Sequence, residues 1–207
     1  MLAIKRRPSS LRGFTLIELL ITMVIGVVLL MVAVPSFTTY KRNAELTSAT
    51  NTLLAAINAA RGEAMKRGMN AMVVPTNNGS DWSTGWVVFV DKTRNQAYDN
   101  TGADTTILTQ SALPSYITVT GTGNASGTGA YIMFDASGYA RSKAVSGGGA
   151  TGASGNVSLT LTRTDTVGSY VGDQTRIILI ANTGRARSCK PSSATDSTCQ
   201  ASATNNQ

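Results

Sequence analysis

The chain has 207 residues, enough for one ordinary globular domain and an anchoring element. Charged residues make up 14% of it and apolar residues 42%, which suits a folded extracytoplasmic domain with polar loops better than a disordered chain or a cytosolic enzyme. It contains no histidine, which excludes a Ser-His-Asp or Cys-His nucleophile and removes the commonest zinc ligand. We therefore expect no catalytic residue, no metal site and no cofactor.

The formal net charge of +7 is unevenly distributed. Four basic residues lie within the first 12 positions, and without them the balance is 14 basic minus 11 acidic residues, or +3. Residues 141–190 hold seven basic and two acidic residues. The last third of the chain is therefore the region in which to look for a basic surface.

Residues 14–34, FTLIELLITMVIGVVLLMVAV, are apolar apart from Glu18. A helix of this length can cross a hydrocarbon core of about 30 Å, and the preceding basic residues predict a cytoplasmic N-terminus. A secretory signal peptide is disfavoured, because the apolar run exceeds the usual ~7–15 residues and no small-x-small cleavage site precedes Pro35. A single-span anchor does not account for Glu18, since a charge inside a bilayer costs about 2.5–3.5 kcal/mol and usually marks a partner.

The stretch RGFTLIELL, residues 12–20, resembles the leader and helix start of type IV pilins and of the related pseudopilins of type II secretion. The resemblance implies that residues 1–13 are a leader peptide, that a prepilin peptidase cuts between Gly13 and Phe14, and that Phe14 becomes N-methylated. It also implies that Glu18 pairs with the terminal amine of a neighbouring subunit in a filament. Removing one member of a buried ion pair costs about 3–5 kcal/mol, so such a pair would fix the register of assembly.

The helical pattern continues beyond the apolar run. Apolar residues recur at spacings of three and four, at Leu46, Ala49, Leu53, Ile57, Ala60 and Ala64. Two basic residues followed by Gly68 are typical of a helix end. We expect residues 14–35 to form a transmembrane and assembly segment, and residues 36–68 an amphipathic continuation of the same helix.

Strand patterns follow Gly68. The expected strands are AMVV, GWVVFVD, TTILTQSAL, YITVT, YIMFD, NVSLTLTRT and TRIILIA. We expect an α+β, pilin-like fold, in which the long N-terminal helix packs on an antiparallel β-sheet domain of residues 69–190, followed by a polar tail of residues 191–207. In an oxidising compartment Cys189 and Cys199 would most simply form a disulfide; two free thiols are the alternative.

Two further stretches, DWSTGWVVFVD at residues 81–91 and IMFDASGYAR at residues 132–141, resemble the GspH and FimT branch of minor pilins and pseudopilins. We interpret the aromatic residues of the first stretch as core residues. The Asp-x-x-Gly of the second is interpreted as a turn. Asp91, Asp99 and Asp104 are interpreted as turn formers, with weak calcium ligation in loops as the alternative.

The stretch NTGRARSCK, residues 182–190, contains Arg185, Arg187 and Lys190. Guanidinium groups bind phosphates in a two-pronged geometry, and a loop tied by a disulfide loses less entropy on binding. A solvated basic loop is the alternative. The motif resembles the Gly-Arg-x-Arg element of FimT-type pilins, which implies a surface for double-stranded DNA.

Four other basic residues, Arg141, Lys143, Arg163 and Arg176, are candidates to extend this surface. We expect phosphate contacts that are sensitive to salt and show no base preference. Tyr170 is the aromatic residue nearest in sequence to the motif of residues 182–190. The scarcity of aromatic residues there disfavours a stacking platform for single-stranded DNA.

The expected function is that of a minor pilin of a type IV pilus that binds extracellular double-stranded DNA for uptake in natural transformation. The alternative is a structural pseudopilin of a type II secretion system, GspH-like and without DNA binding. The expected partners are other pilins or pseudopilins, the prepilin peptidase and the inner membrane before assembly. The globular domain would then lie in the periplasm, and the assembled pilus at the cell surface.

Overall fold

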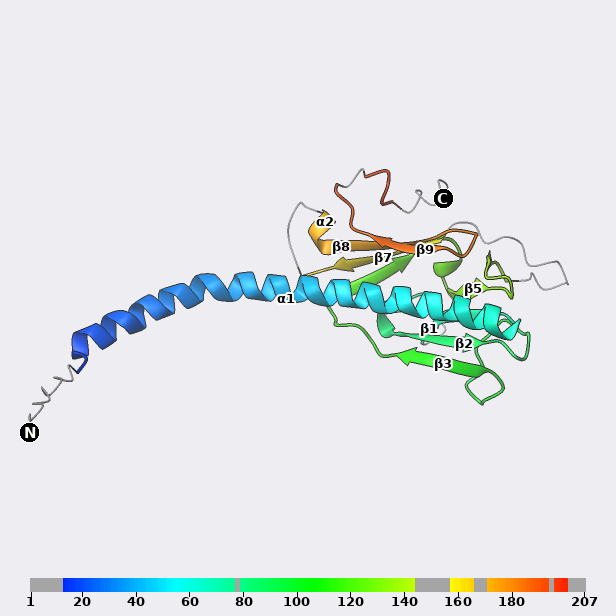
Figure 1. Ribbon diagram of the computed structural model, residues 1–207, viewed down its shortest axis with the longest axis horizontal. Helices are drawn as coiled ribbons and strands as arrows, with labels where there is room; N and C mark the ends of the chain where they lie inside the picture. The colour runs from blue at the N-terminus through cyan, green and yellow to red at the C-terminus, as the bar shows by residue number, and fades with distance from the viewer. Residues whose placement is uncertain (1–12, 77–78, 144–156, 166–170, 194–195, 201–207) are drawn as a thin grey trace, which may run out of the picture. The chain divides into compact units, whose positions relative to one another are not determined.

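The computed structural model describes residues 13–76, 79–143, 157–165, 171–193 and 196–200. The chain divides into two compact units, Met1–Arg42 and Asn43–Gln207. Helix α1 (Leu16–Arg67) begins in the first unit and ends in the second (Figure 1). Within the described ranges, no helix has both the length and the apolar character that crossing a membrane requires. The membrane-spanning role of residues 14–35 stays a prediction from the sequence.

The part of α1 in the second unit buries one side in the core. Its buried apolar residues are Leu46, Ala49, Leu53, Ala56, Ile57, Ala60 and Ala64. This set contains every member of the predicted stripe, because the spacing of three and four places these side chains on one face of a helix. The sequence prediction missed Ala56, which lies beside Ile57 on the same face.

A five-stranded antiparallel sheet has the strand order β3-β2-β1-β5-β6. Its strands are β1 (Ala71–Pro75), β2 (Trp86–Val90), β3 (Thr105–Gln110), β5 (Ile132–Phe134) and β6 (Ala140–Arg141). The side chains of Trp82, Trp86 and Phe89 are fully buried, which confirms their interpretation as core residues.

A second, four-stranded antiparallel sheet has the order β4-β7-β8-β9. Its strands are β4 (Ile117–Gly121), β7 (Val157–Arg163), β8 (Thr175–Ile180) and β9 (Ala186–Cys189). Short helices lie between strands: η1 (Trp82–Thr84), η2 (Gly123–Ala125) and α2 (Val171–Gln174).

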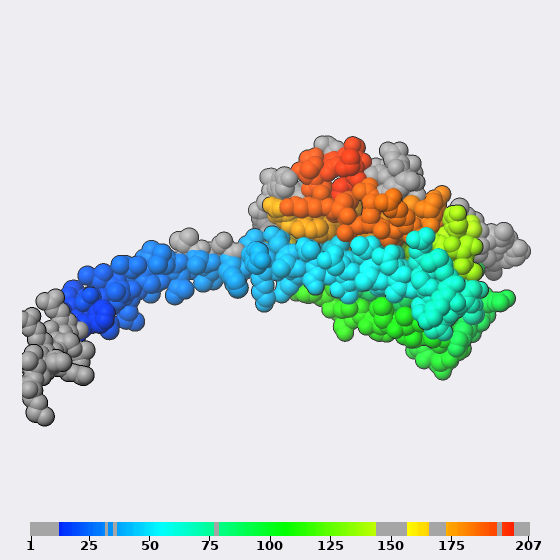
Figure 2. Space-filling view, in the orientation of Figure 1, coloured from blue at the N-terminus to red at the C-terminus, as the bar shows by residue number. Residues whose placement is uncertain are grey.

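One continuous core joins α1 to both sheets. Figures 1 and 2 show β7–β9 along one side of the second half of α1 and β1–β3 along the other. The predicted α+β fold, a helix packed on antiparallel sheets, is confirmed. All seven expected strands form, whereas β6 and β9 were not predicted.

Candidate functional site

The residues predicted for processing and assembly lie at the start of α1. Gly13 and Phe14 precede the helix and are exposed, and Glu18 is exposed in its first turn. The backbone N–H of Glu18 donates to Oγ1 of Thr15 at 3.2 Å, so Thr15 caps one of the free N–H groups of the helix start. The Thr-x-x-Glu spacing of a capping box was visible in the sequence, yet Thr15 was not predicted as a cap.

Arg185 lies in the turn between β8 and β9. The N–H of Ala181 donates to the carbonyl of Arg185 at 3.0 Å, and the N–H of Gly184 donates to the carbonyl of Ala181 at 2.9 Å. Arg185 is exposed, and among the described residues its guanidinium has no hydrogen bond or ion pair. The turn therefore presents a cation to solvent from a hydrogen-bonded backbone.

The β8–β9 turn packs directly against the β5–β6 turn. The N–H of Ala140 donates to the carbonyl of Asn182 at 3.0 Å. Gly184 has a φ of 81°, and a Cβ placed on it would lie only 1.9 Å from the carbonyl oxygen of Gly138. Glycine is therefore required at position 184, both for the left-handed backbone and for the close approach of the two turns.

Arg61 of α1 holds both turns. Its Nε donates to the carbonyl of Gly138 at 2.9 Å, and its Nη2 donates to the carbonyl of Thr183 at 3.3 Å. The sequence did not single out Arg61, because its partners lie 77 and 122 positions away. We refer to Arg61, Gly138 and Gly184 as the turn junction.

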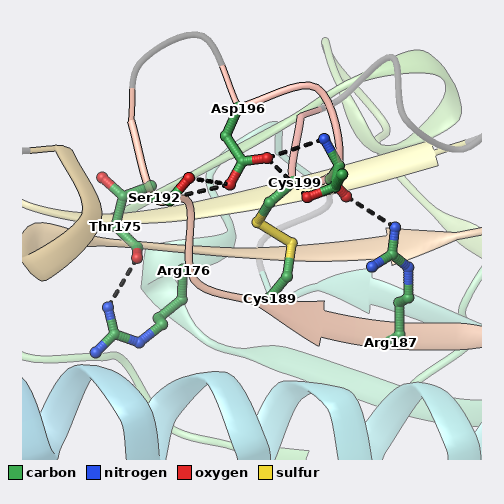
Figure 3. Close-up of a disulfide and its surroundings, with 8 residues drawn as sticks. Thr175, Arg176, Arg187, Cys189, Ser192, Asp196 and Cys199 are labelled. Carbon is green, nitrogen blue, oxygen red and sulfur yellow. Dashed lines mark hydrogen bonds between the residues drawn. A yellow bond between two sulfur atoms is a disulfide. The ribbon is translucent and has the colours of Figure 1, made fainter.

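Arg187 lies on β9, opposite Leu179 of β8, on the face of the sheet that points away from α1 (Figure 3). It is partly buried, and its Nη2 donates to the carbonyl of Thr198 at 2.9 Å. Cys189 and Cys199 form a disulfide, as predicted. The disulfide and Arg187 together hold residues 196–199 over this face of the sheet.

Three of the other predicted cations interact within the domain. Lys190 forms an ion pair with Asp173 at 2.5 Å, and its hydrogen bond holds the pKa of Asp173 below the usual value. Arg141 forms an ion pair with Asp135, also at 2.5 Å. Lys143 places its Nζ 4.5 Å from the centre of the Tyr131 ring, and burial lowers the pKa of Lys143.

Arg163 and Arg176 lie on the α1 side of the sheet. Arg163 is buried; its Nη2 is 2.8 Å from Asp165, and its Nη1 donates to Oδ1 of Asn43 at 2.7 Å. Arg176 donates to Oγ1 of Thr47 on α1 at 3.4 Å and extends toward that helix in Figure 3. These two arginines therefore do not share a face with Arg187.

The predicted turn residues are confirmed. The carboxylates of Asp91, Asp99, Asp104 and Asp135 each accept backbone N–H groups within a few residues or across their loop. Gly138 has a φ of 79°. Tyr170 lies outside the described residues.

Comparisons with known proteins agree with this architecture. The family described as "Type II transport protein GspH" matches residues 49–184, and the "Prokaryotic N-terminal methylation motif" matches residues 9–34. The curated proteins contain no match to the chain.

Two solved structures resemble the fold. The type IV minor pilin FimU of Pseudomonas aeruginosa strain PAO1 is 17% identical, with a TM-score of 0.50 over 74% of this chain and 93% of that one. The minor pseudopilin EpsH from the type 2 secretion system of Vibrio cholerae is 11% identical, with a TM-score of 0.45 over 70% of this chain and 97% of that one. Because the family match covers more than half of the chain, the chain belongs to the GspH family of minor pilins and pseudopilins.

Proposed function

We propose that the protein is a minor pilin of a type IV pilus that binds extracellular double-stranded DNA for uptake in natural transformation. The observation that carries this proposal is the exposed Arg185 on the β8–β9 turn. Because the turn is fixed by backbone hydrogen bonds and by the turn junction, the backbone at Arg185 loses little conformational freedom when the side chain contacts a phosphate. Binding through phosphates weakens as salt rises and carries no sequence information.

The proposed surface is centred on Arg185 and is smaller than the sequence suggested. Arg187 is two residues away but already donates to a carbonyl. Lys190 and Arg141 are held by carboxylates, and Lys143 is partly buried against an aromatic ring. These four residues can assist binding only if a phosphate competes with their present contacts.

For assembly, we propose that the leader is removed after Gly13, that Phe14 is methylated, and that Glu18 pairs with the terminal amine of a neighbouring subunit. The match to the methylation motif supports the first two steps. The exposure of Glu18 and of the apolar side chains around it supports the third. The precursor would lie in the inner membrane with its globular unit in the periplasm, and the mature subunit in a surface pilus.

A structural pseudopilin of a type II secretion system is the second candidate. Three cations of residues 141–190, Arg141, Arg163 and Lys190, form ion pairs within the domain, which favours it, because a surface built to bind DNA would leave more cations free. Both candidates use the same assembly chemistry, so DNA binding separates them.

Fluorescence anisotropy of the full chain in a non-ionic detergent, with a short labelled duplex at low salt, tests the DNA proposal. We expect Arg185→Ala to weaken binding about tenfold, the loss of one charge-assisted hydrogen bond. Arg94→Ala is the matched control, because it removes the same charge from an exposed position in the loop after β2. Absence of binding, or equal effects of the two substitutions, would favour the pseudopilin.

The assembly proposal is tested by measuring how much tagged subunit enters sheared filaments. We expect Glu18→Ala to leave leader removal and membrane insertion intact while reducing incorporation, since the neighbouring amine would lack its counter-charge. Undiminished incorporation would refute the pairing.

A further inference from the structure

We propose that Tyr139 is a base-stacking residue of the same surface, so that the protein binds single-stranded DNA through unpaired bases as well as through phosphates. This inference rests on the proposed function, because it assigns a second group to the surface centred on Arg185. It changes the expected ligand, since phosphate contacts alone do not distinguish a single strand from a duplex.

The exposure of Tyr139 is unusual for this domain. Among the described residues of the second unit, Met65 and Tyr139 are the only large apolar side chains classed as exposed, each at 48%. Met65 lies against the residue that precedes Tyr139, because a Cβ on Gly138 would be 2.7 Å from the sulfur of Met65. Among the described residues of the unit, the large exposed apolar side chains are therefore Tyr139 on the β5–β6 turn and one neighbour of that turn on α1.

The backbone around Tyr139 is held in place. Its N–H donates to Oδ1 of Asp135 at 3.1 Å, and its carbonyl accepts from the N–H of Asp135 at 3.0 Å. Arg141, fixed by its ion pair with Asp135, lies over the ring at 5.6 Å from the ring centre. Arg141 covers one side of the ring, so a base would stack on the other side, which the fixed backbone of the turn leaves available to solvent.

The same contacts place Tyr139 beside the phosphate-binding turn. Its predecessor Gly138 touches Gly184, and its successor Ala140 donates to the carbonyl of Asn182. Gly184 directly precedes Arg185 in the chain. Tyr139 and Arg185 therefore lie on two turns that contact each other, and within the described part of the chain the Arg185 guanidinium has no partner.

This combination matches the chemistry of single-stranded DNA. A base stacks on an aromatic side chain whatever its identity, while a nearby cation binds the adjoining phosphate. Bases inside a duplex are stacked on each other and do not reach the ring. Tyr139 should therefore add affinity for single strands and frayed ends and contribute little to binding of a closed duplex.

The test compares three labelled probes on the full chain in non-ionic detergent: oligothymidylate, an abasic strand of equal length, and a duplex closed by hairpins at both ends. We expect Tyr139→Ala to weaken oligothymidylate binding at least about fivefold, and to change binding of the abasic strand and the closed duplex less than about twofold. Tyr139→Phe should retain the affinity. Arg185→Ala should weaken binding of all three probes.

Tyr139→Leu is the control for misfolding, because it keeps an apolar side chain at the turn but removes the aromatic ring. It should behave as Tyr139→Ala does. An unchanged affinity of either variant for oligothymidylate, or an equal loss for all three probes, overturns the stacking role while leaving the role of Arg185 intact. If the wild-type chain binds none of the probes, both the proposed DNA-binding function and the stacking role of Tyr139 are refuted.

Discussion

Substitution of Gly184 by alanine tests whether the turn junction holds the two sheets together. Gly184 has a φ of 81°, where an alanine costs about 1–2 kcal/mol. The new Cβ would also lie 1.9 Å from the carbonyl oxygen of Gly138 and 2.9 Å from Nε of Arg61. Because the carbonyl of Gly138 belongs to the backbone and cannot rotate away, the two turns must separate. At least one hydrogen bond of Arg61 is then lost, at a further cost of about 1.5–3 kcal/mol. We expect a total destabilisation of about 2.5–5 kcal/mol.

Gly129→Ala is the matched control. Gly129 has a φ of 74°, and a Cβ on it would meet nothing within 4 Å, so only the conformational cost applies. Urea denaturation followed by tryptophan fluorescence reports on the globular unit, because the chain's two tryptophans, Trp82 and Trp86, are buried in it. Equal losses of stability for the two variants would show that the contact between the turns contributes nothing.

Three further changes have distinct expected outcomes. Replacing both Cys189 and Cys199 by serine should lower the free energy of unfolding by about 2–3 kcal/mol, and the variant's urea midpoint should not respond to reductant, whereas the wild-type midpoint should. Arg163→Met should destabilise the domain by about 1–3 kcal/mol, because the partly buried Asp165 loses its cation, yet leave duplex affinity in the anisotropy assay unchanged. Although burial raises the pKa of Asp135, hydrogen bonds from Arg141 and from backbone N–H groups outweigh it and hold the pKa below the ordinary 3.8. The stability that the carboxylate provides is therefore present above pH ~4 and lost as the pH falls below that value, so the difference in urea stability between the wild type and Asp135→Asn should shrink on acidification.

Local sequence patterns predicted the parts of the fold that depend on local geometry. The stripe from Leu46 to Ala64 was readable because helical periodicity is set within a few residues. Strands with alternating or continuous apolar residues could be predicted from the sequence for the same reason. Strand β9, with the sequence ARSC, carries no such pattern. It forms because β8 offers it a backbone partner, which only the tertiary structure supplies.

The candidate site could be predicted less well from the sequence, because its contacts join distant parts of the chain. Arg163 has a partner on α1, 120 positions away, and Arg61 reaches turns 77 and 122 positions away. Tyr139 and Arg185 lie on two turns that contact each other but are separate in the sequence. Spacing along a chain identifies residues capable of binding phosphate but does not show which of them are already paired.

The count of basic residues therefore overstates the surface available to DNA. Of the seven cations in residues 141–190, at least three are ion-paired with carboxylates in the described part of the chain, in the pairs Arg141–Asp135, Arg163–Asp165 and Lys190–Asp173. If all seven contacted phosphates, the logarithm of the binding constant would fall with the logarithm of salt concentration with a slope of about −6. If only Arg185 does so, together with Arg187 after it gives up its contact with Thr198, the slope is about −2. A measured slope near the smaller value would show that the fold, by pairing its cations internally, limits each subunit to a few phosphate contacts, whereas a steep slope would mean that the internal ion pairs open when DNA binds.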